Sequence, residues 1–144
     1  MLQRSAFVLG WLGLVPAVIA ALVVFLGPPA WRELAFRGGA LYAGLILSFL
    51  GGAWWGLATR ARPERAGALF TVAVAPTLAA TALLLLMTPM GLVLMGLVIA
   101  ATVLVDATLV GEGLTPANWL RLRVPLSLGL GAATIALGVA AMLG

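Results

Sequence analysis

Residues 66–110 read AGALFTVAVAPTLAATALLLLMTPMGLVLMGLVIAATVLVDATLV, with Asp106 as the single charged side chain among 45 residues. As one continuous helix, this segment would extend about 67 Å, more than twice the roughly 30 Å of a bilayer's hydrocarbon core. The turn-forming sequence Thr88-Pro89-Met90-Gly91 lies near its middle. The segment therefore predicts two transmembrane helices, residues 67–87 and 90–110, joined by a tight hairpin.

Three further apolar runs of about 20 residues flank this segment and are long enough to cross a bilayer. They cover residues 6–26, 38–59 and 122–143. Glycine, proline and charged residues fill the connections, including a polar stretch at residues 31–37. Pro125 is expected in the first turn of the last run, where proline is tolerated. The chain is thus predicted to be a single transmembrane domain, residues 1–144, with an all-α fold: a polytopic membrane bundle of about five helices.

The composition agrees with lipid as the main solvent. The chain is 64% hydrophobic and 8% charged, whereas soluble domains carry roughly a quarter charged residues. It has no cysteine or histidine, which excludes disulfides and thiolate metal sites, and no cofactor is expected. A pI near 11.5 would suit nucleic acid, but arginines confined to short loops are better explained by membrane orientation and contact with anionic headgroups. We expect the lipid bilayer as a partner and no nucleic acid.

Arginine placement predicts the orientation in the membrane. With five spans, the N-terminus and the second and fourth connections share one side, which holds six arginines against two on the other. The six are Arg4, Arg60, Arg62, Arg65, Arg121 and Arg123, and the two are Arg32 and Arg37. The positive-inside rule then places the N-terminus in the cytoplasm and the C-terminus outside. Trp54, Trp55 and Trp119 fall near the expected cytoplasmic interface, where tryptophan is enriched.

The second run contains small residues at every fourth position. These are Ala40, Gly44, Ser48, Gly52 and Gly56. Small residues at this spacing let membrane helices approach closely. We expect this small-residue stripe to pack helices within the monomer, with the last run as the best-matched partner and the first as another possibility. A contact in an oligomer or with a partner protein is the alternative.

Asp106 is the one ionisable residue clearly inside a predicted span, about four residues from its cytoplasmic end. We expect it to pair with Arg60, Arg121 or Arg123 near the same interface. A polar contact of this kind contributes on the order of 1 kcal/mol or less between membrane helices. Because acids inside membranes are often functional, a substrate or proton role is the alternative, and simple access to water is a third.

Catalysis is poorly supported by these residue types. Without histidine, cysteine or lysine, a serine nucleophile would need a carboxylate as its base, and Ser48 is far in sequence from any acid. The leading interpretation is a non-enzymatic accessory, assembly or structural subunit that packs against another membrane protein. A minimal transporter of a small solute or lipid, which could act as a homo-oligomer, is the alternative, and a lipid-modifying enzyme is third.

Three segments carry a family resemblance that spans nearly the whole chain. They are LGWLGLVP at residues 9–16, Tyr42 with ILSFLGGAWWG at residues 46–56, and WLRLR at residues 119–123. In these segments the chain resembles the domain of unknown function 3429 family, which also includes transmembrane protein 69 of animals. The resemblance implies a five-helix membrane fold found in proteobacteria, hence a bacterial inner (cytoplasmic) membrane, and implies no agreed activity. Many members have histidine where this chain has Trp54, so any imidazole chemistry of relatives is absent here.

Overall fold

The computed structural model describes residues 3–144, so Met1 and Leu2 of the predicted domain 1–144 lie outside the described residues. The described part forms six α-helices: α1 (Arg4–Leu12), α2 (Val15–Leu26), α3 (Pro29–Ala58), α4 (Pro63–Leu86), α5 (Pro89–Gly111) and α6 (Trp119–Leu143). Because α1 and α2 together make one crossing, five stretches are long and apolar enough to span a membrane. The predicted all-α membrane bundle of five spans is confirmed.

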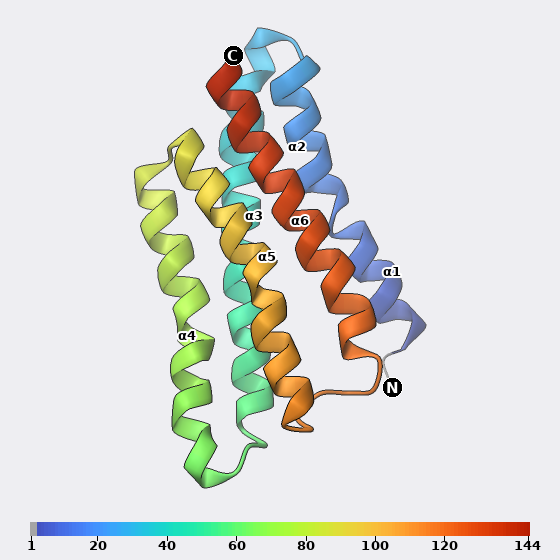
Figure 1. Ribbon diagram of the computed structural model, residues 1–144. Coiled ribbons are helices and arrows are strands. Elements are labelled where there is room, and N and C mark those ends of the chain that lie inside the picture. The colour runs from blue at the N-terminus through green and yellow to red at the C-terminus, as the bar shows by residue number, and fades with distance from the viewer. Residues whose placement is uncertain (1–2) are drawn as a thin grey trace.

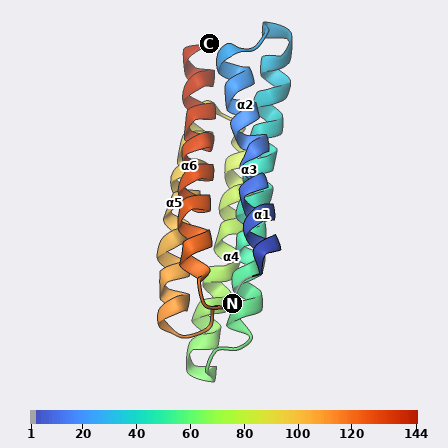
Figure 2. The ribbon, with the colours of Figure 1, turned by 90° about the vertical axis from the view of Figure 1, so that its right-hand side faces the viewer.

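Successive spans run in opposite directions along the bundle (Figures 1 and 2). The start of α1 and the α3–α4 and α5–α6 connections lie at one end, and the C-terminus lies at the other (Figure 1). We call the first end the arginine-rich end, because it holds Arg4, Arg60, Arg62, Arg65, Arg121 and Arg123. The structure thus groups the charges as expected, while the cytoplasmic location of this end stays a prediction.

The first span is not the continuous helix expected over residues 6–26. It breaks at Gly13 and Leu14, between α1 and α2. Pro16 lies in the first turn of α2 and has no N–H to donate to a carbonyl of α1. The Gly13 carbonyl accepts a hydrogen bond from the Tyr42 hydroxyl of α3 instead, at 2.5 Å. This contact ties the break to the rest of the bundle.

Three helices, α3, α4 and α6, begin at least three residues earlier than the apolar runs indicate. The polar connection expected at residues 31–37 is wrong, because α3 begins at Pro29 and runs for 30 residues. Proline suits a helix start, and Arg37 donates to Glu33 one turn before it, which stabilises the polar first turns. Likewise α6 begins at Trp119, so Pro125 lies inside the helix rather than in its first turn.

The hairpin between α4 and α5 follows the prediction. The Thr88 side chain caps α5 by accepting from the Gly91 N–H at 3.0 Å, and Pro89 occupies the first turn. The preceding Met87 adopts the left-handed conformation, with φ of 41°. A strained residue at the end of one helix and a cap at the start of the next make the reversal tight.

Three glycines bring the backbones of α5 and α6 close together. A Cβ added to Gly96 would lie 2.6 Å from the Gly131 carbonyl oxygen, and one added to Gly131 would lie 2.7 Å from the Gly96 carbonyl oxygen. Two turns further along α6, a Cβ added to Gly138 would lie 2.6 Å from the Pro89 carbonyl oxygen. Only glycine permits backbones this close. These three glycines therefore fix how α5 and α6 cross.

Candidate functional site

The polar centre of the bundle is built around Asp106 of α5, whose side chain is 0% exposed. Its Oδ1 accepts hydrogen bonds from the indole N–H of Trp54 at 3.0 Å and of Trp119 at 2.9 Å. Its Oδ2 accepts from Arg123 Nε at 2.9 Å, which forms a buried salt bridge. One carboxylate thus joins α3, α5 and α6 near the arginine-rich end.

A second row of polar groups continues from Arg123 toward the middle of the bundle. Arg123 Nη2 lies 3.5 Å from the Thr102 hydroxyl oxygen. That hydroxyl donates to the Ile99 carbonyl at 2.6 Å and lies 3.1 Å from the Ser127 hydroxyl. Thr102 and Ser127 are both buried. We refer to Trp54, Thr102, Asp106, Trp119, Arg123 and Ser127 together as the polar cluster.

Local structure brings the members of the polar cluster together. Asn118 adopts the left-handed conformation directly before α6 and makes no side-chain capping hydrogen bond, and Trp119 lies in the first turn. Trp119 and Arg123 are one turn apart, as are Arg123 and Ser127, so all three lie on one face of α6. On α5, Thr102 and Asp106 are likewise one turn apart, and this face meets that of α6.

The buried polar atoms of the cluster are all hydrogen-bonded. Among residues 3–144, no buried side-chain nitrogen or oxygen lacks a partner. Asp106 and Arg123 form a salt bridge, and the carboxylate accepts hydrogen bonds from three donors. In the part of the chain that the structure describes, no three acidic side chains gather where they could hold a metal ion. The arrangement is suited to clamping three helices at a fixed register.

The structure selects one of the three expected arginine partners. Arg123 binds Asp106, as predicted for one candidate. Arg121 is exposed, and Arg60 donates to the Leu114 carbonyl at 3.5 Å instead. Of the three alternatives, Arg123 is therefore the partner, and Arg60 and Arg121 do not pair with Asp106. Trp54 is buried, and its indole N–H donates to the Asp106 carboxylate, while its depth near the cytoplasmic interface stays a prediction.

The predicted small-residue stripe divides into two parts. Ala40 and Gly44 are buried, and Ser48 is partly buried and hydrogen-bonds with Thr77 of α4 at 2.9 Å. Gly52 and Gly56 are exposed, and no heavy atom lies within 4 Å of a Cβ built on either. The stripe thus packs within the monomer only in its first half.

The partner expected for this stripe also needs correction. A Cβ on Gly44 would meet Leu84 at 2.6 Å, so α4 is the neighbour rather than the last span. Further along α3, the close contact passes through Gly51, which faces the Ala73 carbonyl of α4. A step of four residues rotates about 40° beyond one turn of a 3.6-residue helix. The line of contact between α3 and α4 therefore leaves the small-residue stripe and passes through Gly51.

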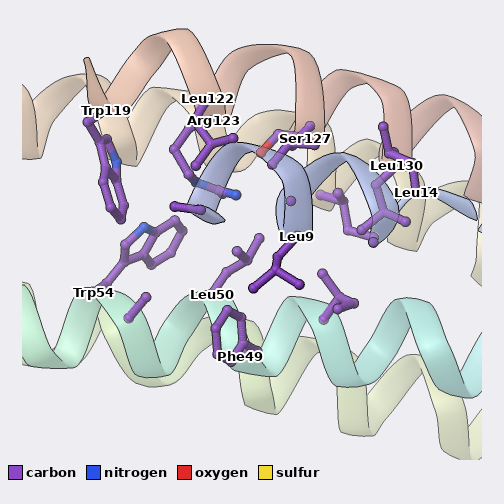
Figure 3. Close-up of a pocket in the computed structure, with 17 residues that line it drawn as sticks. Leu9, Leu14, Phe49, Leu50, Trp54, Trp119, Leu122, Arg123, Ser127 and Leu130 are labelled. Carbon is purple, nitrogen blue, oxygen red and sulfur yellow. The ribbon is translucent and has the colours of Figure 1, made fainter. Parts of the chain in front are cut away.

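A cavity of about 420 Å³ adjoins the polar cluster between α1, α3 and α6. Figure 3 shows Trp54 and Trp119 at one end of it, Leu14 and Leu130 at the other, and Arg123 and Ser127 along the α6 wall. Most of the other lining residues are leucines, alanines and glycines. The sequence did not indicate this cavity, because the size of the cavity depends on the distance between α1 and α3.

Comparison with known proteins identifies one family over nearly the whole chain. A family model described as "Protein of unknown function (DUF3429)" matches residues 2–140. No curated protein and no solved structure matches the chain. The matched residues include all three segments that carry the resemblance, at residues 9–16, 42–56 and 119–123.

Proposed function

The chain belongs to the DUF3429 family of unknown function, and we propose a function for it from its structure. We propose that it is a non-enzymatic accessory or assembly subunit of the bacterial inner membrane, which binds a transmembrane helix of another membrane protein against α3. A relation to animal transmembrane protein 69 stays a prediction of the resemblance.

The observation that carries this proposal is the open glycine face of α3, formed by Gly52 and Gly56. Both glycines are exposed, and a Cβ on either would meet no atom within 4 Å. Elsewhere on the same helix, Gly39, Gly44 and Gly51 each press against a neighbouring helix, and Gly38 near the other end is also open. Since small residues let membrane helices pack closely, the open glycine face has the surface of a helix contact without an occupant from its own chain.

The polar cluster supports a structural rather than a chemical role for the buried charges. The Asp106 carboxylate accepts three hydrogen bonds from its own chain and is 0% exposed. A coupling or catalytic acid must reach a proton or substrate. Because breaking this buried pair would be costly, we infer that it holds α3, α5 and α6 in the arrangement that presents the open glycine face.

The cavity is the one feature that would support the alternative function, a minimal transporter of a small solute or lipid. Its α3 lining comes from residues 46–54 and its α6 lining from residues 119–130, whereas these helices extend over residues 29–58 and 119–143. The cavity therefore occupies only the half of the bundle near the arginine-rich end. A passage across the membrane would require a larger rearrangement, so the accessory role takes precedence.

Co-purification from native membranes tests the accessory role. A tagged chain, extracted gently, is expected to bring down a membrane protein in stoichiometric amount. Gly56→Leu should abolish this association, because leucine fills the open glycine face. Gly67→Leu is the matched control, since Gly67 on α4 is equally open, and it should retain the partner. Recovery of a homo-oligomer without another protein would favour the transporter. A partner that still co-purifies with Gly56→Leu would exclude the open glycine face as its binding site.

A further inference from the structure

We infer that the cavity between α1, α3 and α6 binds one acyl chain of a membrane phospholipid, with a chain ester carbonyl accepting a hydrogen bond from Arg123. The phospholipid comes from the leaflet at the arginine-rich end. This inference does not depend on the proposed accessory role, because the open glycine face contributes no residue to the cavity lining.

The dimensions of the cavity fit one lipid tail. Its volume of about 420 Å³ lies within the range of roughly 300–1,000 Å³ for small-molecule sites. Along α6 it extends from Trp119 to Leu130, which corresponds to about 17 Å at 1.5 Å per residue. That is close to half of a hydrocarbon core of roughly 30 Å, and therefore to the depth of one leaflet.

The cavity is reached from the side, where the acyl chains of the bilayer lie. Leu9 of α1 and Phe49 of α3 both line it, yet they are 68% and 70% exposed. They therefore form an apolar rim between the cavity and the bilayer. No residue of α1 is buried, so α1 covers the cavity without sealing it. A lipid tail can enter between α1 and α3 without leaving an apolar environment.

Arg123 supplies a hydrogen-bond donor inside this apolar space. The residue is 8% exposed, and its Nε and Nη2 face Asp106 and Thr102. Among residues 3–144, Nη1 has no hydrogen-bond partner, yet no buried nitrogen is unpaired. Nη1 is therefore not fully buried, and Arg123 is one of the residues that line the cavity. An acceptor carried by a ligand would complete the guanidinium's hydrogen bonds.

The charge of the polar cluster distinguishes an ester from a carboxylate. Asp106 already neutralises Arg123 through the bond from Nε to Oδ2. A second carboxylate, as in a free fatty acid, would introduce an unpaired negative charge close to Asp106 where the dielectric constant is low. A neutral ester carbonyl accepts the same hydrogen bond without that cost. Trp54 and Trp119 lie at this end of the cavity (Figure 3), and tryptophan is enriched at the headgroup level of a bilayer.

Native mass spectrometry of the detergent-purified chain tests the inference. Wild type is incubated with dioleoyl phosphatidylglycerol in one arm and with oleic acid in the other. We expect about one phospholipid per chain. Ala53→Phe, which places a ring in the cavity, should lower that occupancy at least tenfold. Ala75→Phe, at an exposed α4 position outside the lining of this cavity, should leave it unchanged.

A second variant and two opposite outcomes keep the test decisive. If Ala53→Phe does not fold, Ala6→Phe fills the cavity from α1 instead. Retention of phospholipid by a folded cavity-filled variant, or binding of oleic acid in place of phospholipid, would overturn the inference. Gly56→Leu should keep its lipid while losing a protein partner, so the failure of one proposal is distinguishable from the failure of the other.

Discussion

Replacing Asp106 with asparagine removes the charge while preserving the shape of the side chain. The asparagine carbonyl still accepts from both indoles, but its NH₂ takes the place of Oδ2 and faces the Arg123 Nε–H. Two donors then oppose each other, and the guanidinium, 8% exposed, keeps its charge without a counterion. Removing one partner of a buried ion pair typically costs 3–5 kcal/mol. Because Nη1 retains some access, we expect a loss near the lower end, about 3 kcal/mol.

This magnitude exceeds what the sequence indicated, on the order of 1 kcal/mol or less for a polar contact between membrane helices. The increase comes from the complete burial of Asp106 and from the three donors it accepts. A loss of this size corresponds to a fall in melting temperature on the order of 10 °C. Tryptophan fluorescence of the detergent-purified protein during a thermal ramp measures it.

Two further variants sharpen the measurement. Glu33→Gln also breaks an ion pair, but Glu33 and Arg37 are exposed, so the loss should be below roughly 1 kcal/mol. The double variant Asp106→Asn with Arg123→Gln should be more stable than Asp106→Asn alone, because two neutral amides can pair and no buried charge remains. A melting curve for Asp106→Asn that matches wild type, together with a loss of function in cells, would refute the structural role of Asp106.

Three other predictions concern topology and packing. A reporter that works only in the cytoplasm should be active after Arg65 and inactive at Gly144, and the opposite result would invert the assigned orientation. Changing the three arginines in residues 60–65 to glutamine reduces the bias to three against two, so protease protection should reveal mixed orientation; a single unchanged pattern would mean that other features set topology. Gly51→Leu should abolish a sharp elution peak on size exclusion, because its side chain meets the Ala73 carbonyl, whereas Gly52→Leu should elute like wild type because its Cβ meets nothing. Equal behaviour of the two variants would contradict the observed packing.

Features encoded in local sequence could be predicted well. Five apolar runs of bilayer length predicted five spans, and Thr88-Pro89 predicted the hairpin, because proline and a capping hydroxyl act within one turn. The first residues of the helices were harder to predict. Pro29 begins α3 upstream of charged residues, since an ion pair between Glu33 and Arg37 lets a polar segment remain helical beyond the apolar run.

Features that depend on neighbouring helices could be predicted only in part. Arg123 was one of three candidate partners of Asp106, and nothing in the α5–α6 connection indicated which arginine would turn inward. The Trp54 donor was missed because Trp54 lies 52 positions from Asp106. The Trp119 donor lies 13 positions away, across the α5–α6 connection. A four-residue spacing suggested a seam through Gly52, but the helix period moved it to Gly51. Gly131 and Gly138, seven residues apart and so on one helix face, carried a signal that sequence analysis overlooked.

Site-specific photo-crosslinking in native membranes tests the central proposal most directly. A photoreactive amino acid is placed at Gly56 in the open glycine face and, in a separate chain, at Leu85, which is 81% exposed on α4. We predict one discrete protein adduct from position 56 and none from position 85. Lipid adducts alone at both positions would contradict the binding of a partner helix by α3.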